Sequence, residues 1–180
     1  PSELGLAFKS VTLLFSDLKG STALYERVGD IRAYEIVRAH FKLLRDIVAD
    51  SGGAVVKTMG DAVMASFADP APALAAALQM NREICQVGAE EDLVLKIGLH
   101  AGPCIAVDSN ERLDYFGQTV NIAARVQGLA DGSEIVITQP IYDAPGAREL
   151  IAASHVIVSA DDAVLRGMDR PTTFYRLCAE

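Results

Sequence analysis

Apolar residues in the first third of the chain follow strand spacing first and helix spacing afterwards. The run Val11 to Phe15 is short and continuous, which is typical of a buried strand. Gly20-Ser21-Thr22 then indicate a turn and a helix start. Beyond Asp30, a residue type that caps helices, apolar residues recur at steps of three and four. They predict an amphipathic helix that stops at Gly52-Gly53 and carries the stripe Tyr34, Val37, Phe41, Leu44 and Val48.

A hairpin and a second helix are predicted next. Ala54 to Met59 and Ala62 to Phe67 have the composition of strands and flank the turn dipeptide Gly60-Asp61. Asp69-Pro70 supplies a cap and a first-turn proline for the helix that follows. Its apolar positions again recur at helical steps, at Leu74, Ala77, Leu78 and Ile84. We expect this helix to pack beside the first long one.

The last half of the chain has shorter signals. Leu95 to His100 and Cys104 to Val107 are predicted as a strand pair divided by Gly102-Pro103, and the polar Asp108 to Arg112 as a projecting connection. A helix is expected over Gly117 to Leu129, and a strand over Ile135 to Thr138. The remainder is expected to be a β-rich extension that ends in Phe174 to Leu177.

The order strand, helix, strand, strand, helix, strand is that of a ferredoxin-like βαββαβ core. We therefore predict an α+β fold with an antiparallel sheet and a C-terminal β-rich extension. In such a sheet the first strand lies beside the third. The end of the first strand, Asp17, should then meet the start of the third, Asp61, at one edge of the sheet.

Composition is that of one folded domain covering residues 1–180, with 51% hydrophobic and 22% charged residues. The net charge of −8 is spread along the chain without a basic stripe, which argues against a nucleic-acid partner. An anionic polyphosphate would need local cations or bound metal. The three cysteines are odd in number and widely spaced, so we expect a reduced, cytoplasmic compartment. The start at Pro1-Ser2 indicates a domain excised from a longer, regulated protein.

Two carboxylates carry the first hypothesis about chemistry. Asp17 and Asp61 taken singly are ordinary turn residues, but converging carboxylates repel each other unless a cation lies between them. One or two carboxylates together with phosphate oxygens are what Mg²⁺ prefers. The helix start at Gly20, Ser21 and Thr22 adds free amides that suit a phosphate group. This edge is predicted to hold a metal and a triphosphate.

Other polar residues leave two interpretations open. Strand alternation predicts that Lys57 shares a face with Val55 and Met59, where it is either a snorkelling edge lysine or a site residue. Asn121 and Arg125 lie four apart on a mostly apolar helix. That narrow polar line favours a cleft or subunit interface over simple exposure. The histidines do not cluster with other ligand types at metal spacing, so a structural role is expected for them.

Three blocks resemble, in order and spacing, the signatures of class III adenylyl and guanylyl cyclases. They are Phe15 to Thr22, Val56 to Asp61 and Leu113 to Arg125. The resemblance continues to the end of the chain, where Leu165-Arg166-Gly167 and Phe174-Tyr175 are similar to the closing strand pair of the family. A diguanylate cyclase would instead need an acidic Gly-Gly-Asp/Glu-Glu-Phe turn, and the hairpin here has a different turn.

The resemblance implies a role for each matching residue. Asp17 and Asp61, with the backbone carbonyl of Leu18, would bind two divalent cations, Mg²⁺ or Mn²⁺, that assist attack of the ribose 3′-hydroxyl on the α-phosphate. Lys57 and Asp114 would select the purine, and Asn121 and Arg125 would orient the ribose and stabilise the transition state. Family sites combine both metal aspartates from one subunit with the other four residues from its partner, which implies a homodimer.

The purine pair distinguishes the two nucleotides. A donor-only Lys57 and an acceptor-only Asp114 complement N1 and the amino group of adenine, and guanine inverts that pattern. The expected function is therefore cyclisation of ATP to cyclic AMP. The alternatives are a guanylyl cyclase and a catalytically silent domain that binds nucleotide.

A few positions depart from the family. Lys19 stands at a usually uncharged position, Ser21 at an often aromatic one, and Arg166 replaces a more usual lysine. The segment between Gly102 and Asp114 is shorter than in the animal enzymes. Gly20, Ser21, Thr22 and Arg166 are taken as phosphate-binding candidates.

Overall fold

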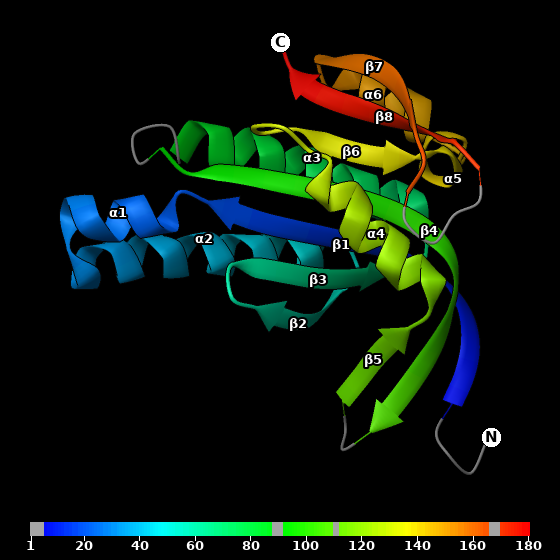
Figure 1. The fold of residues 1–180 in the computed structure, drawn as a ribbon, viewed down its shortest axis with the longest axis horizontal. Coiled ribbons are helices and arrows are strands. Elements are labelled where there is room, and N and C mark those ends of the chain that lie inside the picture. Colours follow the sequence, from blue (N-terminus) through cyan, green and yellow to red (C-terminus); the bar gives the residue numbers. More distant parts are fainter. Residues whose placement is uncertain (1–5, 88–91, 110–111, 166–169) are drawn as a thin grey trace.

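A single mixed sheet forms the centre of the computed structural model, which describes residues 6–87, 92–109, 112–165 and 170–180 (Figure 1). The strands run in the order β2-β3-β1-β4-β6-β8-β7, and β5 pairs with β4 outside this path. Their bounds are β1 Leu6–Lys19, β2 Ala54–Met59, β3 Ala62–Phe67, β4 Val94–Ser109, β5 Arg112–Phe116, β6 Ile135–Thr138, β7 Val156–Ala163 and β8 Thr172–Ala179.

The predicted ferredoxin-like core is confirmed. β1 lies between β3 and β4 and pairs antiparallel with both, and β2 pairs antiparallel with β3. β6 adds to β4 in parallel, and the antiparallel pair β8 and β7 extends the sheet beyond it. The first strand therefore lies beside the third, as the order of elements requires.

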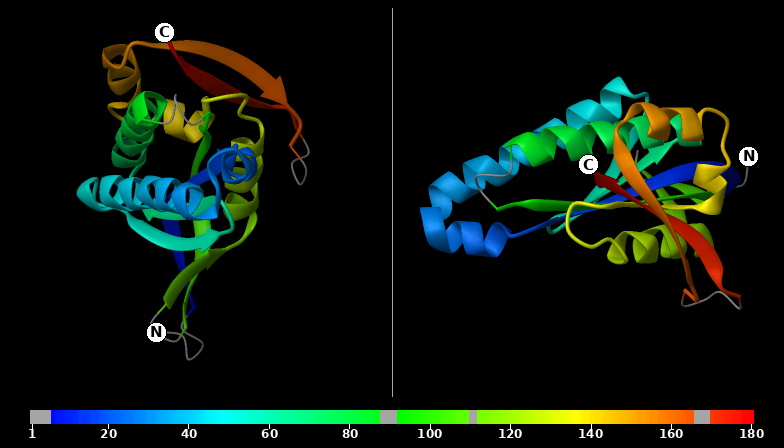
Figure 2. Two further views of the ribbon diagram at one scale, coloured as in Figure 1. Left: turned by 90° about the vertical axis from the view of Figure 1, so that its left-hand side faces the viewer. Right: turned by 90° about the horizontal axis from the view of Figure 1, so that it is seen from above.

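Helices cover the two faces of the sheet unequally. In the left panel of Figure 2, α4 lies on one side of the sheet, whereas α2 and α3 lie on the other. The helix bounds are α1 Ser21–Val28, α2 Asp30–Asp50, α3 Pro70–Val87, α4 Gln118–Gly128, α5 Gln139–Tyr142 and α6 Ala147–Ala153. None of the helices in these ranges is long and apolar enough to cross a membrane.

Side chains of β1 alternate between the two faces of the sheet and so contribute to two separate core clusters. Leu14 belongs to the large cluster packed under α2 and α3, and Leu13 and Phe15 belong to a smaller cluster that includes Ala123 of α4. Successive strand residues point to opposite faces, so one strand supplies both layers. The face under α4 is the more open one, and it is the face that Asp17, two residues after Phe15, also shares.

The buried stripe of α2 differs from the predicted one at Tyr34 and also at Phe41, which is half-buried. Val37, Leu44 and Val48 are buried as expected, but Tyr34 is 58% exposed. Ala33 and His40 are buried instead. Each residue turns the helix by about 100°, so Tyr34 lies one step round the helix from the buried position of Ala33. The tyrosine ring consequently lies on the surface.

The predicted break at Gly102-Pro103 is wrong, because β4 continues through it. Ser10 of β1 pairs with Pro103, and the Pro103 carbonyl accepts a hydrogen bond from Thr119 Oγ1 at 2.7 Å. The ring nitrogen points to the same side as that carbonyl, away from β1, where the sheet needs no donor. A Cβ on Gly102 would lie 2.8 Å from the same hydroxyl oxygen. Both residues let α4 approach the strand.

Two further stretches differ from expectation. The projecting connection is a hairpin arm, in which β4 runs on to Ser109 and β5 returns from Arg112 to Phe116. The tail is not purely β-rich, because α5 and α6 precede β7. α5 starts after the extended Thr138 with proline in its first turn, which is a recognised helix-start signal.

The C-terminal extension is tied to the loop after α4. Arg176 of β8 donates to the Leu129 carbonyl at 2.6 Å and to Glu134 at 2.8 Å. Glu134 also accepts from the Cys178 thiol at 3.1 Å, and burial raises the pKa of that thiol to about 11. These contacts hold the end of α4 against the sheet.

Close packing of α4 on β4 generates a prediction for stability. A Cβ on Gly98 would run into the backbone of Gln127, whereas one on Gly128 would meet nothing within 4 Å. We expect Gly98→Ala to lower the free energy of unfolding by about 1 to 3 kcal/mol, as overpacking does. Gly128→Ala is the matched control, and it should leave the free energy of unfolding unchanged or raise it. Urea unfolding of both variants checks this, and equal midpoints for the two would contradict the proposed packing.

Candidate active site

The two predicted carboxylates lie together at one edge of the sheet. Asp17 of β1 pairs with Ala62, the residue after Asp61, and the amide of Leu18 donates to the Asp61 carbonyl at 3.1 Å. The expected meeting of the strand end and the hairpin turn is therefore confirmed. It follows from the register of β1 with β3.

Each carboxylate has a partner within the chain. Lys19 Nζ lies 2.8 Å from Asp17 Oδ2, and Ser21 Oγ donates to Asp61 Oδ2 at 2.7 Å. The hydrogen bond and negative charge of Asp17 raise the pKa of the Lys19 ammonium, with a smaller contribution from Asp61. Lys19 and Ser21, the partners of the two carboxylates, are positions at which the sequence departs from the resembled family. Ser21 was a phosphate-binding candidate, and in this structure it contacts a carboxylate.

The residues after Lys19 form the expected helix start. Gly20 has a left-handed backbone with φ 99° and is followed directly by Ser21, the first residue of α1. A Cβ on Gly20 would lie 2.6 Å from the Asp92 carbonyl, so both conformation and space favour glycine here. Thr22 is exposed in the first turn. The free amides of this turn lie next to the carboxylates, while Arg166 falls outside the described residues.

The donor set at this edge fits a hard divalent cation that is shared with a ligand. The Leu18 side chain is buried, so it can contribute only through its backbone. Across the described ranges, His, Cys, Asp and Glu do not form any group of three or more that could hold a metal. Two carboxylates and a carbonyl leave further positions on Mg²⁺ or Mn²⁺ for phosphate oxygens and water.

Lys57 and Asp114 come together from different strands. Lys57 Nζ of β2 lies 3.0 Å from Asp114 Oδ2 of β5, and both side chains are partly exposed. The other carboxylate oxygen of Asp114 accepts from the Tyr115 amide at 2.8 Å. The pair thus presents one cation and one anion side by side, although the residues are far apart in sequence.

The predicted face of Lys57 is partly wrong. Val55 pairs with Ala65, but Lys57 pairs with Met64, because the register shifts between them. Ala65 and Met64 point to opposite faces, and they belong to different core clusters. Lys57 therefore lies on the face opposite Val55. An extra residue at Val56 produces this reversal, as β-bulges do.

A cavity of about 600 Å³ adjoins the pair and includes residues that the sequence prediction missed. Lys57, Arg112, Leu113 and Tyr115 are among its lining residues. β5 was missed because its five residues follow a polar connection. Alternation of apolar and polar residues from Arg112 to Phe116 was the available signal.

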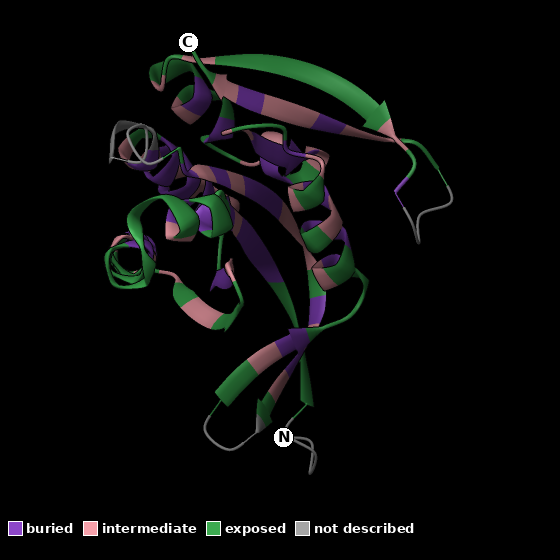
Figure 3. Ribbon diagram, turned by 60° about the vertical axis from the view of Figure 1, so that its left-hand side comes forward, coloured by how far each residue is buried: buried purple, intermediate pink, exposed green. Residues whose placement is uncertain are grey.

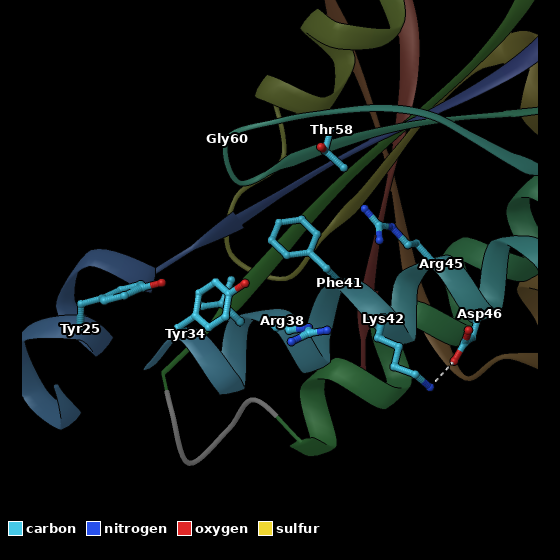
Figure 4. A pocket seen from close by; sticks show the side chains of 10 residues that line it. Tyr25, Tyr34, Arg38, Phe41, Lys42, Arg45, Asp46, Thr58 and Gly60 are labelled. Atoms are coloured by element: carbon cyan, nitrogen blue, oxygen red, sulfur yellow. Dashed lines mark hydrogen bonds and ion pairs between the residues drawn. The ribbon is translucent and has the colours of Figure 1, made fainter. Parts of the chain in front are cut away.

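A second hollow of about 470 Å³ lies between α2 and the β2–β3 hairpin (Figure 4). Phe41 projects toward the hairpin, near Thr58 and Gly60, and Arg45 lies beside it. Its lining includes none of the predicted site residues. The hollow is thus separate from the predicted chemistry.

Asn121 and Arg125 lie on α4, the helix on the face of the sheet opposite α2 and α3. Ile122, Ala123 and Val126 of α4 are buried, whereas Asn121 is exposed and Arg125 is half-buried. The polar line predicted from the sequence therefore faces away from the core. The side chains of Asp17 and Asp61 make their hydrogen bonds to Lys19 and Ser21, at the junction of β1 with α1.

Comparisons with known proteins identify the family of the chain. The family described as adenylate and guanylate cyclase catalytic domain matches residues 6–177. The receptor-type adenylate cyclase ESAG 4 of Trypanosoma brucei brucei is 27% identical over a gapped alignment of 213 positions, which covers 95% of this chain and 17% of that protein. The chain spans less than half the length of this relative and of a receptor-type adenylate cyclase from Trypanosoma equiperdum, of which it covers 44%.

Solved structures share the fold. The adenylyl cyclase CyaB from P. aeruginosa aligns with a TM-score of 0.78 at 22% identity, covering 97% of this chain and 96% of that one. The guanylate cyclase domain of RhGC from Catenaria anguillulae, in complex with GTP, aligns with a TM-score of 0.75 at 23% identity, covering 97% and 99%. The fold is therefore common to both nucleotide specificities. Since one family match spans almost the whole chain and the architecture agrees with it, the chain belongs to the class III family of adenylate and guanylate cyclase catalytic domains.

Proposed function

We propose that this domain is an adenylyl cyclase that converts ATP into 3′,5′-cyclic AMP and pyrophosphate. The contact between Lys57 and Asp114 is the observation that carries the proposal. A donor and an acceptor 3.0 Å apart match the adjacent N1 and amino group of adenine. Guanine would leave both protein groups facing groups of their own kind, which is costly when they are buried.

The proposed metal site consists of Asp17, Asp61 and the Leu18 carbonyl. When bound there, two divalent cations would supply charge neutralisation for the triphosphate and activation of the 3′-hydroxyl. Gly20, Ser21 and Thr22 place free amides of α1 beside this edge, where a phosphate oxygen can accept from them. Arg166 is kept as a further phosphate-binding candidate.

Asn121 and Arg125 act on the reacting part of the nucleotide in this proposal. The Asn121 amide would hold the ribose so that its 3′-oxygen points at the α-phosphorus. The Arg125 guanidinium would meet the charge that builds on the α-phosphate and the leaving oxygen, where a fixed cation is effective. Neither residue needs to form a covalent bond.

We further propose that each site is shared between two copies of the chain. The arm formed by β4 and β5 combines buried and exposed residues, and its tip is exposed (Figure 3). Phe8, Ile105 and Phe116 lie in register across three neighbouring strands, and Phe8 is 83% exposed. An apolar row of this kind on an arm is typical of an interface. A two-fold homodimer would place α4 of one copy over the carboxylates of the other.

The proposed single domain belongs to a longer protein whose other segments regulate it. The matched relatives extend far beyond the region that this chain covers. A regulatory segment that alters the contact between two copies would alter both sites together.

The purine assignment predicts a preference for ATP over GTP. We expect Lys57→Glu combined with Asp114→Cys to reduce that preference at least tenfold in kcat/KM, because the donor and acceptor pattern is removed. Separation of cyclic AMP and cyclic GMP after incubation with each nucleotide and Mg²⁺ or Mn²⁺ measures it. Equal production of both by the wild type would refute adenine selection, and no product would favour a silent domain.

The shared site predicts complementation between two inactive variants. Asp17→Ala and Arg125→Ala should each be inactive alone, since one lacks a metal ligand and the other the transition-state cation. Co-expression should restore activity, because a mixed dimer has one intact site and one doubly damaged site. Random pairing sets a ceiling at about a quarter of the wild-type specific activity. Verified mixed dimers that stay inactive would contradict a site built from two chains.

A further inference from the structure

Lys19 lies between the carboxylates and the start of α1, and its contact with Asp17 follows from the strand. Residues two apart on β1 point to the same face, so Lys19 and Asp17 are neighbours whenever β1 forms. Their side-chain atoms Nζ and Oδ2 are 2.8 Å apart. The lysine side chain is 57% exposed, and that of the aspartate 22%. The ammonium group thus faces solvent, whereas the carboxylate is largely enclosed.

The contact places a positive charge on a carboxylate that is proposed to bind a metal ion. Two carboxylates that converge repel each other, and the Lys19 ammonium offsets this repulsion. Ser21 holds one oxygen of Asp61 in the same way, at 2.7 Å. A divalent cation bound to Asp17 and an ammonium 2.8 Å from the same carboxylate would repel each other strongly. A bound metal therefore weakens the contact of Lys19 with Asp17.

A destination for the displaced ammonium lies close by. Lys19 is followed directly by Gly20 and the first turn of α1, which the proposed function assigns to the triphosphate. A lysine has a flexible four-carbon stem, so its head can move without disturbing the buried β1 backbone. Phosphate oxygens that arrive with the metal are strong acceptors for an ammonium group.

We propose that Lys19 is a displaceable counter-cation that couples metal binding to nucleotide binding. It holds Asp17 while the site is free of nucleotide, and it moves to a phosphate oxygen of the metal–ATP complex. Metal alone meets competition from Lys19, whereas metal together with ATP gives the lysine a new partner. This inference rests on the proposed function, because it takes Asp17 as a metal ligand.

Lys19→Met tests the proposal by binding rather than by turnover. Mn²⁺ binding is followed by electron paramagnetic resonance, first without nucleotide and then with 3′-deoxy-ATP, which cannot cyclise. Without nucleotide the variant should bind Mn²⁺ about two- to fivefold more tightly, the range set by loss of a partly exposed ion pair. With Mn²⁺ present it should bind 3′-deoxy-ATP about tenfold more weakly, through loss of a charge-assisted hydrogen bond.

Lys42→Met is the matched control, because Lys42 also pairs with an aspartate, Asp46, at 3.3 Å, but on α2. Neither affinity should change in that variant. Unchanged or weaker Mn²⁺ binding in Lys19→Met would overturn the competition, and unchanged 3′-deoxy-ATP binding would overturn the transfer to phosphate. Asp17→Ala separates this from the proposed function. If Asp17→Ala binds Mn²⁺ as the wild type does, the metal site itself is wrong.

Discussion

Antiparallel pairing of β1 with β3 is the constraint on which the site depends. The hydrogen bond from the Leu18 amide to the Asp61 carbonyl fixes this register at the end of β1. A slip of one residue would turn Asp17 to the face packed under α2 and α3 and would separate the two carboxylates. The cluster of Leu14, Leu18 and Val63 on that face opposes such a slip. Packing of the core and placement of the carboxylates are thus a single requirement.

The six proposed site residues lie in several separate parts of one chain. The carboxylates, Lys19 and the start of α1 lie at the junction of β1 with the hairpin, whereas Asn121 and Arg125 lie on the outward side of α4. Phe8 and Phe116 of the apolar row on the arm are exposed, and so is Asn121 of α4. In the proposed homodimer a second copy would cover both of these surfaces.

Residue spacing and turn residues predicted the elements that depend only on neighbouring residues in the sequence. The hairpin strands, the helix over Gln118–Gly128 and the meeting of Asp17 with Asp61 follow from period, turn residues and element order. The bulge at Val56 could not be predicted, because it depends on pairing with β3 rather than on the residues of β2 alone. The break predicted at Pro103 was wrong for a similar reason. Its tolerance depends on Thr119, a residue on another element.

The roles of the site residues are not decided by the fold, since structures with adenylyl and guanylyl cyclase names share it. A crystal structure of the domain with Mn²⁺ and 3′-deoxy-ATP tests the central claim most directly. The account predicts one nucleotide held by Asp17 and Asp61 of one chain and by Lys57, Asp114, Asn121 and Arg125 of another. A nucleotide that contacts all six residues of a single chain, or that binds away from them, would contradict it.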